Sequence, residues 1–271
     1  MSSATYQSLR VSRQGTVCRI RMDRPQARNA INTTLVNEFR AALAEHRDTA
    51  TVVVVEGLPE VFCTGADFAA LGEGGQGGQG GQGGEGGARS GGGDPGPLYD
   101  LWLDLATGPF VSIAHIRGEV TAGGVGFAAA CDIALADDTA RFSLSELLWG
   151  LLPACVLPFL VRRTGEQAAR YLTLTTQPVP VTDALRYGLV DAWDARSDDL
   201  LRRHLLRLRR LTKPAVTRCK AYFAELNPAL AASRAPALAA NREVFGDPRN
   251  LDAIARYVRT GRFPWEEEEV R

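Results

Sequence analysis

The chain has 271 residues, enough for one large domain or for a domain with an appendage. Its 31 basic and 31 acidic residues balance, so no net field favours nucleic acid or an anionic membrane. Apolar residues make up 45% and charged residues 23%, which excludes a fully disordered chain.

Targeting, membrane and metal signals are missing from the sequence. No run of 18 apolar residues occurs, and the first 15 residues lack the apolar stretch of a signal peptide. The five cysteines are scattered without a CxxC pair, and the three histidines are too dispersed to suggest a metal site. We therefore expect a cytosolic protein with reduced, mostly buried thiols, no metal and no membrane partner.

Residues 72–96 stand apart, because they hold 15 of the chain's 28 glycines. Such a tract cannot offset its ordering entropy, so we expect a flexible, solvated insert. Patterned sequence resumes at Pro97, so the insert interrupts a domain rather than ending one. An inert, expanded loop is favoured over a mobile lid.

Strand and helix signals alternate on both sides of this insert. Residues 17–22 alternate apolar and polar side chains, and residues 51–55 (TVVVV) suit a strand buried on both faces. Further core strands are expected at 111–116 and 132–136, and helices from Asn32 or Thr33 to His46 and from Thr121 to Cys131. Short repeated units of strand and helix predict an α/β fold.

The pattern changes to helices alone after about residue 197. A helix is expected to start at Ser197, with others over 213–226 and 248–259. We therefore predict a core of residues 1–197 and a helical region of residues 198–271. The arginines of 202–210 are interpreted as a solvated helix face, with binding of an acidic carrier protein as the minor alternative.

Two turns of small residues each lie just before an expected helix. The first surrounds Ala66, in the segment VFCTGADF, and the second surrounds Gly123, in TAGGVGF. Small residues let a substrate approach the backbone, and the free N–H groups at a helix start favour a developing anion. Two such groups aimed at one point would form an oxyanion hole.

Three motifs together resemble the crotonase (enoyl-CoA hydratase/isomerase) superfamily. They are Arg24-Pro25 with Asn29-Ala30-Ile31, then FCTGADF, and then GGVGFAAACDIALAD. The resemblance covers nearly the whole chain. It implies a ClpP/crotonase-like spiral of repeated ββα units, followed by C-terminal helices used in trimerisation.

The resemblance also implies roles for individual residues. The backbone N–H groups of Ala66 and Gly123 match the family's oxyanion donors, each worth roughly 3–4 kcal/mol of barrier. Hydratases of the family carry two catalytic glutamates, and these positions hold Gly126 and Glu146 here. One carboxylate is therefore missing, which argues against ordinary hydration, but a single one suffices for a syn elimination.

Six further residues are candidates for substrate contact. The resemblance places Gln26 and Arg28 near the pantetheine end of the substrate. The two turns contribute Cys63, Asp67 and Gly124, and Tyr99, which follows the insert, would reach the site from the loop side. For Asp67 and Tyr99, helix capping and packing are the favoured alternatives. His115 is interpreted as a core histidine rather than a catalytic one.

A subgroup of the superfamily is closer still. The strings GLPEVFCTGADF, PLYDLW, SLSELLWGLLPACVLPFLVRR, RHLLRLRRL and TGRFPWE resemble the dehydratases of polyketide β-branching cassettes. That resemblance implies dehydration of 3-hydroxy-3-methylglutaryl on an acyl carrier protein to 3-methylglutaconyl. The phosphopantetheine arm arrives with the substrate, so no other cofactor is implied, and the chain is expected to form a homotrimer or a dimer of trimers.

Three other functions stay open. The sister decarboxylase of the same pathway generally lacks a glutamate at position 146, and a general enoyl-CoA hydratase would need the missing carboxylate. A catalytically inactive scaffold or an RNA-binding relative of the same fold is the non-enzyme alternative. Neutral net charge and only two lysines argue against RNA binding.

Overall fold

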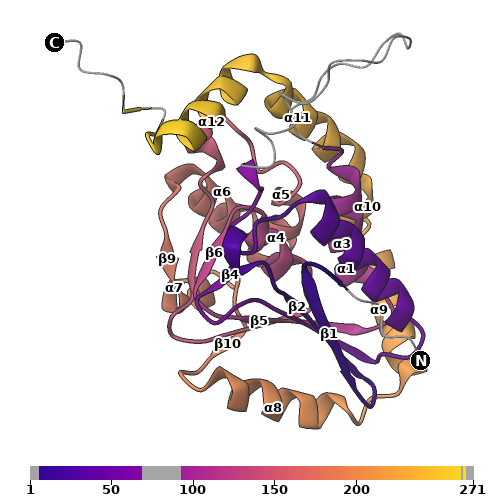
Figure 1. The fold of residues 1–271 in the computed structure, drawn as a ribbon. Coiled ribbons are helices and arrows are strands. Elements are labelled where there is room, and N and C mark those ends of the chain that lie inside the picture. Colours follow the sequence, from indigo (N-terminus) through magenta and orange to yellow (C-terminus); the bar gives the residue numbers. More distant parts are fainter. Residues whose placement is uncertain (1–5, 69–92, 264, 267–271) are drawn as a thin grey trace, which may run out of the picture.

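The computed structural model describes residues 6–68, 93–263 and 265–266, and two sheets form its framework (Figure 1). The larger sheet has the strand order β1-β2-β3-β5-β7-β10. β1 and β2 form an antiparallel hairpin, and the strands that follow pair in parallel. The strands are β1 (Leu9–Gln14), β2 (Val17–Met22), β3 (Val52–Glu56), β5 (Val111–Ile116), β7 (Ile133–Ala136) and β10 (Ala192–Trp193).

The smaller sheet has the order β4-β6-β8-β9. Its first three strands pair in parallel, and β9 closes the edge in the antiparallel sense. The strands are β4 (Val61–Cys63), β6 (Glu119–Thr121), β8 (Arg141–Ser143) and β9 (Val179–Pro180).

Successive strands along the chain alternate between the two sheets. β3, β5 and β7 join the larger sheet, and β4, β6 and β8, which follow them, join the smaller one. A helix follows the second strand of the later two units, α4 (Gly123–Ala130) after β6 and the 3-10 helix η2 (Glu146–Trp149) after β8. This repeat is the spiral of ββα units that the family resemblance implies.

The remaining helices cover the sheets and extend toward the C-terminus. The early ones are η1 (Pro25–Ala27), α1 (Thr33–His46), α3 (Gly96–Thr107), α5 (Leu157–Thr164), α6 (Glu166–Thr175) and α7 (Val181–Arg186). The later ones are α8 (Ser197–Leu208), α9 (Lys213–Leu226), α10 (Ala229–Ala232), α11 (Arg234–Gly246) and α12 (Pro248–Thr260).

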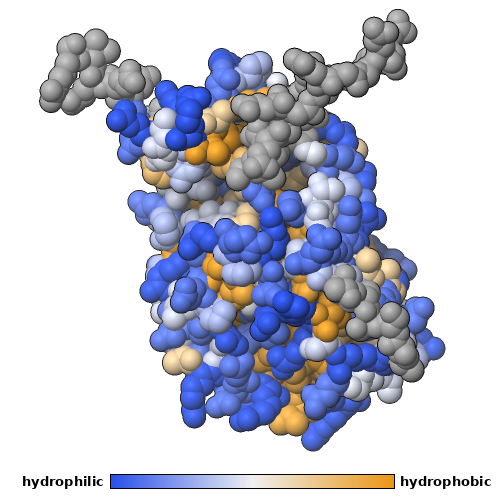
Figure 2. Space-filling view, in the orientation of Figure 1, coloured by the Kyte–Doolittle hydropathy of each residue, from blue (hydrophilic) through white to orange (hydrophobic). Residues whose placement is uncertain are grey.

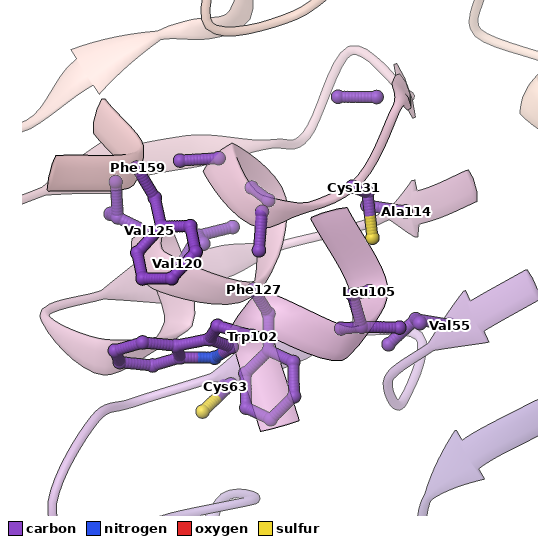
Figure 3. Packing of buried hydrophobic residues seen from close by; sticks show 14 of the residues in the cluster. Val55, Cys63, Trp102, Leu105, Ala114, Val120, Val125, Phe127, Cys131 and Phe159 are labelled. Atoms are coloured by element: carbon purple, nitrogen blue, oxygen red, sulfur yellow. The ribbon is translucent and has the colours of Figure 1, made fainter. Parts of the chain in front are cut away.

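Side-chain patterning explains why the expected elements form. The four valines of β3 are almost fully buried, because helices cover both faces of the larger sheet. α1 starts where the Asn32 side chain accepts a hydrogen bond from the Leu35 amide, and its apolar stripe is buried. The main core packs around α3 and α4, with Trp102, Phe127 and Phe159 grouped there (Figure 3).

The helical C-terminal region stays in contact with the rest of the fold. Leu200, Leu201 and Leu205 of α8 pack on the valines and isoleucines of the larger sheet. α12 instead returns to η2, where Ile254 packs against Trp149. The division into residues 1–197 and 198–271 stays a prediction. α8, which belongs to the second part, packs on the larger sheet of the first part.

Residues 69–92, which include most of the glycine-rich insert, lie outside the described residues. The end of the insert is described: Asp94 accepts hydrogen bonds from the Gly96 amide and from Arg242 of α11. Gly96 therefore belongs to α3, which corrects the expected end of the insert at that residue.

The surface is mainly polar, as the charged residues in the composition lead one to expect. The face shown in Figure 2 is mainly hydrophilic, with hydrophobic residues exposed at separate places. All five cysteines are free and four of them are buried, as expected. No helix in the described part of the chain is both long and apolar enough to cross a bilayer.

Candidate active site

The first turn of small residues presents the Ala66 amide outward. The Ile31 amide donates to the Gly65 carbonyl at 2.7 Å, and the Asp67 amide donates to the Ile31 carbonyl at 3.0 Å. In extended chain, successive amides point to opposite sides. The Ala66 N–H therefore points away from Ile31, and it has no hydrogen-bond partner among the described residues.

The segment around Asn29 holds this turn in place. Asn29 is fully buried with a positive φ of 55°, and its side-chain amide donates to the Phe62 carbonyl at 3.1 Å. The side-chain oxygen Oδ1 of Asn29 accepts a hydrogen bond from the Arg24 amide at 2.8 Å, and the Arg24 guanidinium pairs with Asp67 at 2.9 Å. The motif that carries the family resemblance thus has a physical role, because it anchors the segment that carries Ala66.

The second turn contains a strained residue. Ala122 has φ 52° and ψ −117°, a conformation that costs a residue with a Cβ about 1–3 kcal/mol. Its amide donates to the Ser143 carbonyl of β8 at 2.9 Å, and its carbonyl accepts from the Val125 amide. Gly123 follows as the first residue of α4, where its N–H has no intrahelical acceptor.

The two turns touch each other at glycines. Gly65 has a φ of 85°, and a Cβ placed on it would lie 2.6 Å from the Ala122 Cβ and 3.3 Å from the Gly123 amide nitrogen. A Cβ on Gly123 would in turn lie 3.7 Å from the Gly65 Cα. The residue before Ala66 therefore contacts Gly123 and its strained neighbour, so the segments that carry the two candidate amides adjoin.

Glu146 begins η2, three residues after β8 ends. Its Oε2 atom is buried and has no hydrogen-bond partner among the described residues. Burial raises the pKa of this carboxyl to about 7, although a hydrogen bond from its own amide lowers it in part. A carboxyl that titrates near neutral pH suits both the removal and the return of a proton.

Two contacts connect the segment from β8 to η2 with the two turns of small residues. One is the hydrogen bond from the Ala122 amide to Ser143, three residues before Glu146. The other is the edge-on contact of Phe68 with Trp149, whose ring centroids are 5.9 Å apart. Glu146 is thereby attached to both segments that supply candidate amide donors.

Position 126 holds no carboxylate and has no room for one. A Cβ on Gly126 would lie 2.5 Å from Cζ2 and 2.7 Å from Cη2 of Trp102. The indole fills the space into which a longer side chain at this position would extend. Glu146 is therefore the one acid of the two family positions.

Three of the other predicted contact residues lie near the surface. Gln26 is exposed in η1, and Arg28 is exposed with its guanidinium paired to Glu119. Asp67 is mostly enclosed and pairs with Arg24. Each of the three residues is next to the turn that carries Ala66 or lies in the segment that holds this turn. Their contact with substrate stays a prediction.

The other three are part of the packing. Cys63 is fully buried, which raises the pKa of its thiol to about 12, and a Cβ on Gly124 would lie 2.3 Å from the Cys63 carbonyl oxygen. Tyr99 is fully buried, and its hydroxyl donates to the Leu230 carbonyl at 2.6 Å. Cys63 and Gly124 therefore pack against each other, and no exposed side-chain surface of Cys63 or Tyr99 is available to a ligand.

His115 is buried in the larger sheet, as expected for a core histidine. Its Nδ1 lies 3.1 Å from Glu56, and its Nε2 lies 3.0 Å from the Ser197 hydroxyl at the start of α8. Both ring nitrogens of His115 therefore have a hydrogen-bond partner within the fold.

The sequence alone does not single out Trp102, Ala122 or Trp149. Trp102 belongs to the string PLYDLW, which carried the resemblance without a role for the tryptophan. Nothing in the local sequence reports the positive φ of an alanine or the return of α12 onto Trp149, because both depend on contacts between distant segments.

Comparison with known proteins agrees with this fold. Residues 12–268 match the enoyl-CoA hydratase/isomerase family model. The Bacillaene synthase dehydratase PksH of Bacillus subtilis (strain 168) is 51% identical over 269 residues, which are 99% of this chain and 100% of that protein. The 2,3-dehydroadipyl-CoA hydratase of Escherichia coli (strain K12) is 30% identical over 73% of this chain and 72% of its own length.

Solved structures give the same result. A crystal structure described as a polyketide biosynthesis enoyl-CoA hydratase (pksH) from Bacillus subtilis matches with a TM-score of 0.89 at 50% identity. The match covers 96% of this chain and 100% of that one. The strand alternation, the paired turns and these likenesses over nearly the full length lead to one conclusion: the chain belongs to the enoyl-CoA hydratase/isomerase family.

Proposed function

We propose that this chain is a hydro-lyase that removes water from 3-hydroxy-3-methylglutaryl carried on an acyl carrier protein, giving 3-methylglutaconyl. The observation that carries the proposal is the buried Oε2 atom of Glu146, which has no hydrogen-bond partner among the described residues, on a segment that contacts both adjoining amide turns. The full-length likeness to a dehydratase named for bacillaene synthase supports the polyketide setting.

The proposed reaction is a syn elimination. The carboxylate of Glu146 takes the proton from Cα, and the electron pair moves into the thioester carbonyl. The N–H groups of Ala66 and Gly123 stabilise the resulting enolate oxygen. The enolate then expels the β-hydroxyl, which leaves as water with the proton returned by Glu146.

The absence of a second acid favours elimination of a tertiary hydroxyl. Gly126 offers no proton, and Trp102 blocks the space for a larger residue there. The 3-methyl substituent eases cleavage of the C–O bond, so one carboxyl that acts on one face of the chain is sufficient.

The sister decarboxylation is the alternative with the same fold. A methylmalonyl-CoA decarboxylase matches this structure with a TM-score of 0.78 at 19% identity, so the architecture alone does not choose between the two reactions. The buried acid at position 146 favours dehydration, because loss of carbon dioxide to an enolate needs no base at that position.

A homotrimer is proposed as the assembly, with the carrier protein as the partner that delivers substrate. Tyr222, Phe223 and Leu226 of α9 are each 60% exposed or more, a large apolar face for a single chain. Tyr222→Ser with Phe223→Ser is expected to shift the protein to smaller species in sedimentation. An unchanged sedimentation coefficient would exclude this face from the assembly.

The test of function is an assay with two forms of the same acyl group. The 3-hydroxy-3-methylglutaryl group is loaded on a carrier protein or on CoA, and the product is read by mass spectrometry. Loss of water, faster from the carrier-bound form, is the expected result. Loss of carbon dioxide would indicate the decarboxylase, and no turnover of either form would indicate a scaffold.

A further inference from the structure

The indole N–H of Trp102 is an unexplained polar group at the candidate site. Trp102 is 1% exposed, and its Nε1 atom has no hydrogen-bond partner among the described residues. Leaving a buried donor unsatisfied is costly, so such groups are rare in folded proteins. The ring itself is well packed, between Phe127 and Phe159 with centroid distances of 5.8 Å to each.

The position of the ring shows where this N–H lies. A Cβ on Gly126 would be 2.9 Å from Cε2, the carbon bonded to Nε1, and a Cβ on Gly123 would be 3.8 Å from Cζ2. The ring edge that ends at the N–H therefore borders both glycines. One of them carries a proposed oxyanion amide, and the other stands at the position of the missing carboxylate. Figure 3 shows this ring beside Phe127, with Cys63 close to it in the view.

We infer that the Trp102 N–H donates a hydrogen bond to the β-hydroxyl of the substrate as that group leaves. The inference rests on the proposed dehydration and assigns a further residue to it. As the Cβ–O bond breaks, negative charge develops on the hydroxyl oxygen until Glu146 delivers the proton. An indole N–H is a donor only and exchanges no proton with the substrate. It stabilises the leaving oxygen, and Glu146 remains the sole proton carrier.

This role accounts for both unusual features together. Glycine at position 126 makes room for the indole, and the indole brings a neutral donor to the place of a charged acid. The orphaned N–H then gains its partner only when substrate is bound. The Oε2 atom of Glu146 is likewise buried without a hydrogen-bond partner among the described residues, which fits a donor and an acid that share one ligand.

The test separates proton removal from departure of the hydroxyl. Trp102→Phe removes the N–H and keeps an aromatic ring. Dehydration of the 3-hydroxy-3-methylglutaryl thioester is measured beside exchange of the α-proton with deuterium in the 3-methylglutaryl thioester, which has no hydroxyl. We expect dehydration to fall about 10- to 100-fold, as for a lost hydrogen bond to a charged group, while exchange stays unchanged.

Phe159→Leu is the matched control, because it loosens the same cluster and keeps the N–H. Its two rates are expected to change by the same factor. If Trp102→Phe does not fold, replacement of Trp102 by benzothienylalanine keeps the ring shape and puts sulfur in place of the N–H.

Two outcomes would overturn the inference. Equal losses of exchange and dehydration in the Trp102 variants would assign the ring to packing alone. Unchanged dehydration would show that the N–H has no part in the reaction. Failure of the proposed function is recognised separately, because the wild-type protein would then exchange the α-proton and release no water.

Discussion

Phe68 and Trp149 pack edge to face, with ring centroids 5.9 Å apart and planes at 74°. Phe68 lies two residues after Ala66, and Trp149 lies three residues after Glu146. Trp149 also contacts Tyr257 of α12, with 4.5 Å between the two ring centroids. The contact therefore connects the segments of the proposed oxyanion donor and of the proposed acid with the C-terminal helix through one aromatic cluster.

Trp149→Ala tests this connection. The loss of its ring contacts is expected to lower the free energy of unfolding by about 3–5 kcal/mol and to increase amide hydrogen exchange in α12. Turnover should fall as well, because η2 loses its support. Trp193→Ala is the control, since Trp193 is 39% exposed on β10. Normal turnover with a fully exchanging α12 would show that the cluster does not hold Glu146.

Glu146→Gln keeps the side-chain shape and removes the proton carrier. Dehydration is expected to fall about 10²- to 10⁴-fold, with the oligomeric state unchanged in sedimentation. Glu243→Gln, at an exposed position on α11, should leave the rate as it is. If the Glu146 variant turned over at the wild-type rate, the mechanism would need another base.

The same variant has a predictable effect on stability. The pKa of Glu146 is about 7 in the folded protein and near 4.5 when unfolded, so the folded state holds this proton more tightly. The wild type therefore loses stability as pH rises from about 4.5 to 7, by about 3 kcal/mol in total, and the loss stays constant above that.

Glu146→Gln lacks this ionisation. It should be more stable than the wild type at pH 8 by up to that amount, and the difference should shrink toward zero at pH 4. Urea unfolding at the two pH values measures this directly. A difference independent of pH would contradict the raised pKa.

Gly65→Ala is expected to damage the oxyanion site. The new Cβ would be 2.6 Å from the Ala122 Cβ, in a backbone conformation with φ 85°. Both effects displace the Gly123 amide, so turnover should fall at least 10-fold. Gly15→Ala is the control, because Gly15 also has a positive φ, of 63°, and nothing lies within 4 Å of the added atom. Equal loss of activity in both variants would argue against a role of the Gly65 contact.

Local sequence was sufficient for much of the fold. The valine run of β3, the capped helix α1 and the leucine stripe of α8 are set by neighbours along the chain, and all three appear where expected. The family resemblance supplied the spiral, which periodicity alone does not specify. The structural neighbours confirm that architecture.

Contacts between distant segments were beyond local reasoning. The Tyr99 hydroxyl donates a hydrogen bond to the carbonyl of Leu230, 131 residues away. Trp149 packs against Ile254 of α12, more than 100 residues later. Neither partner is visible from the sequence around these residues. The indole at Gly126 belongs to the same class, since only the packed core shows that Trp102 fills that space.

Each of the three proposed chemical groups stands directly after the second strand of its own ββα unit. Ala66 follows β4, Gly123 follows β6 and Glu146 follows β8. The strands that fix these positions lie in separate repeats, and the two amide turns contact each other at Gly65, while Glu146 stands on the third repeat. In such an arrangement a new reaction can arise by exchange of the group after β8, while the paired turns are inherited together.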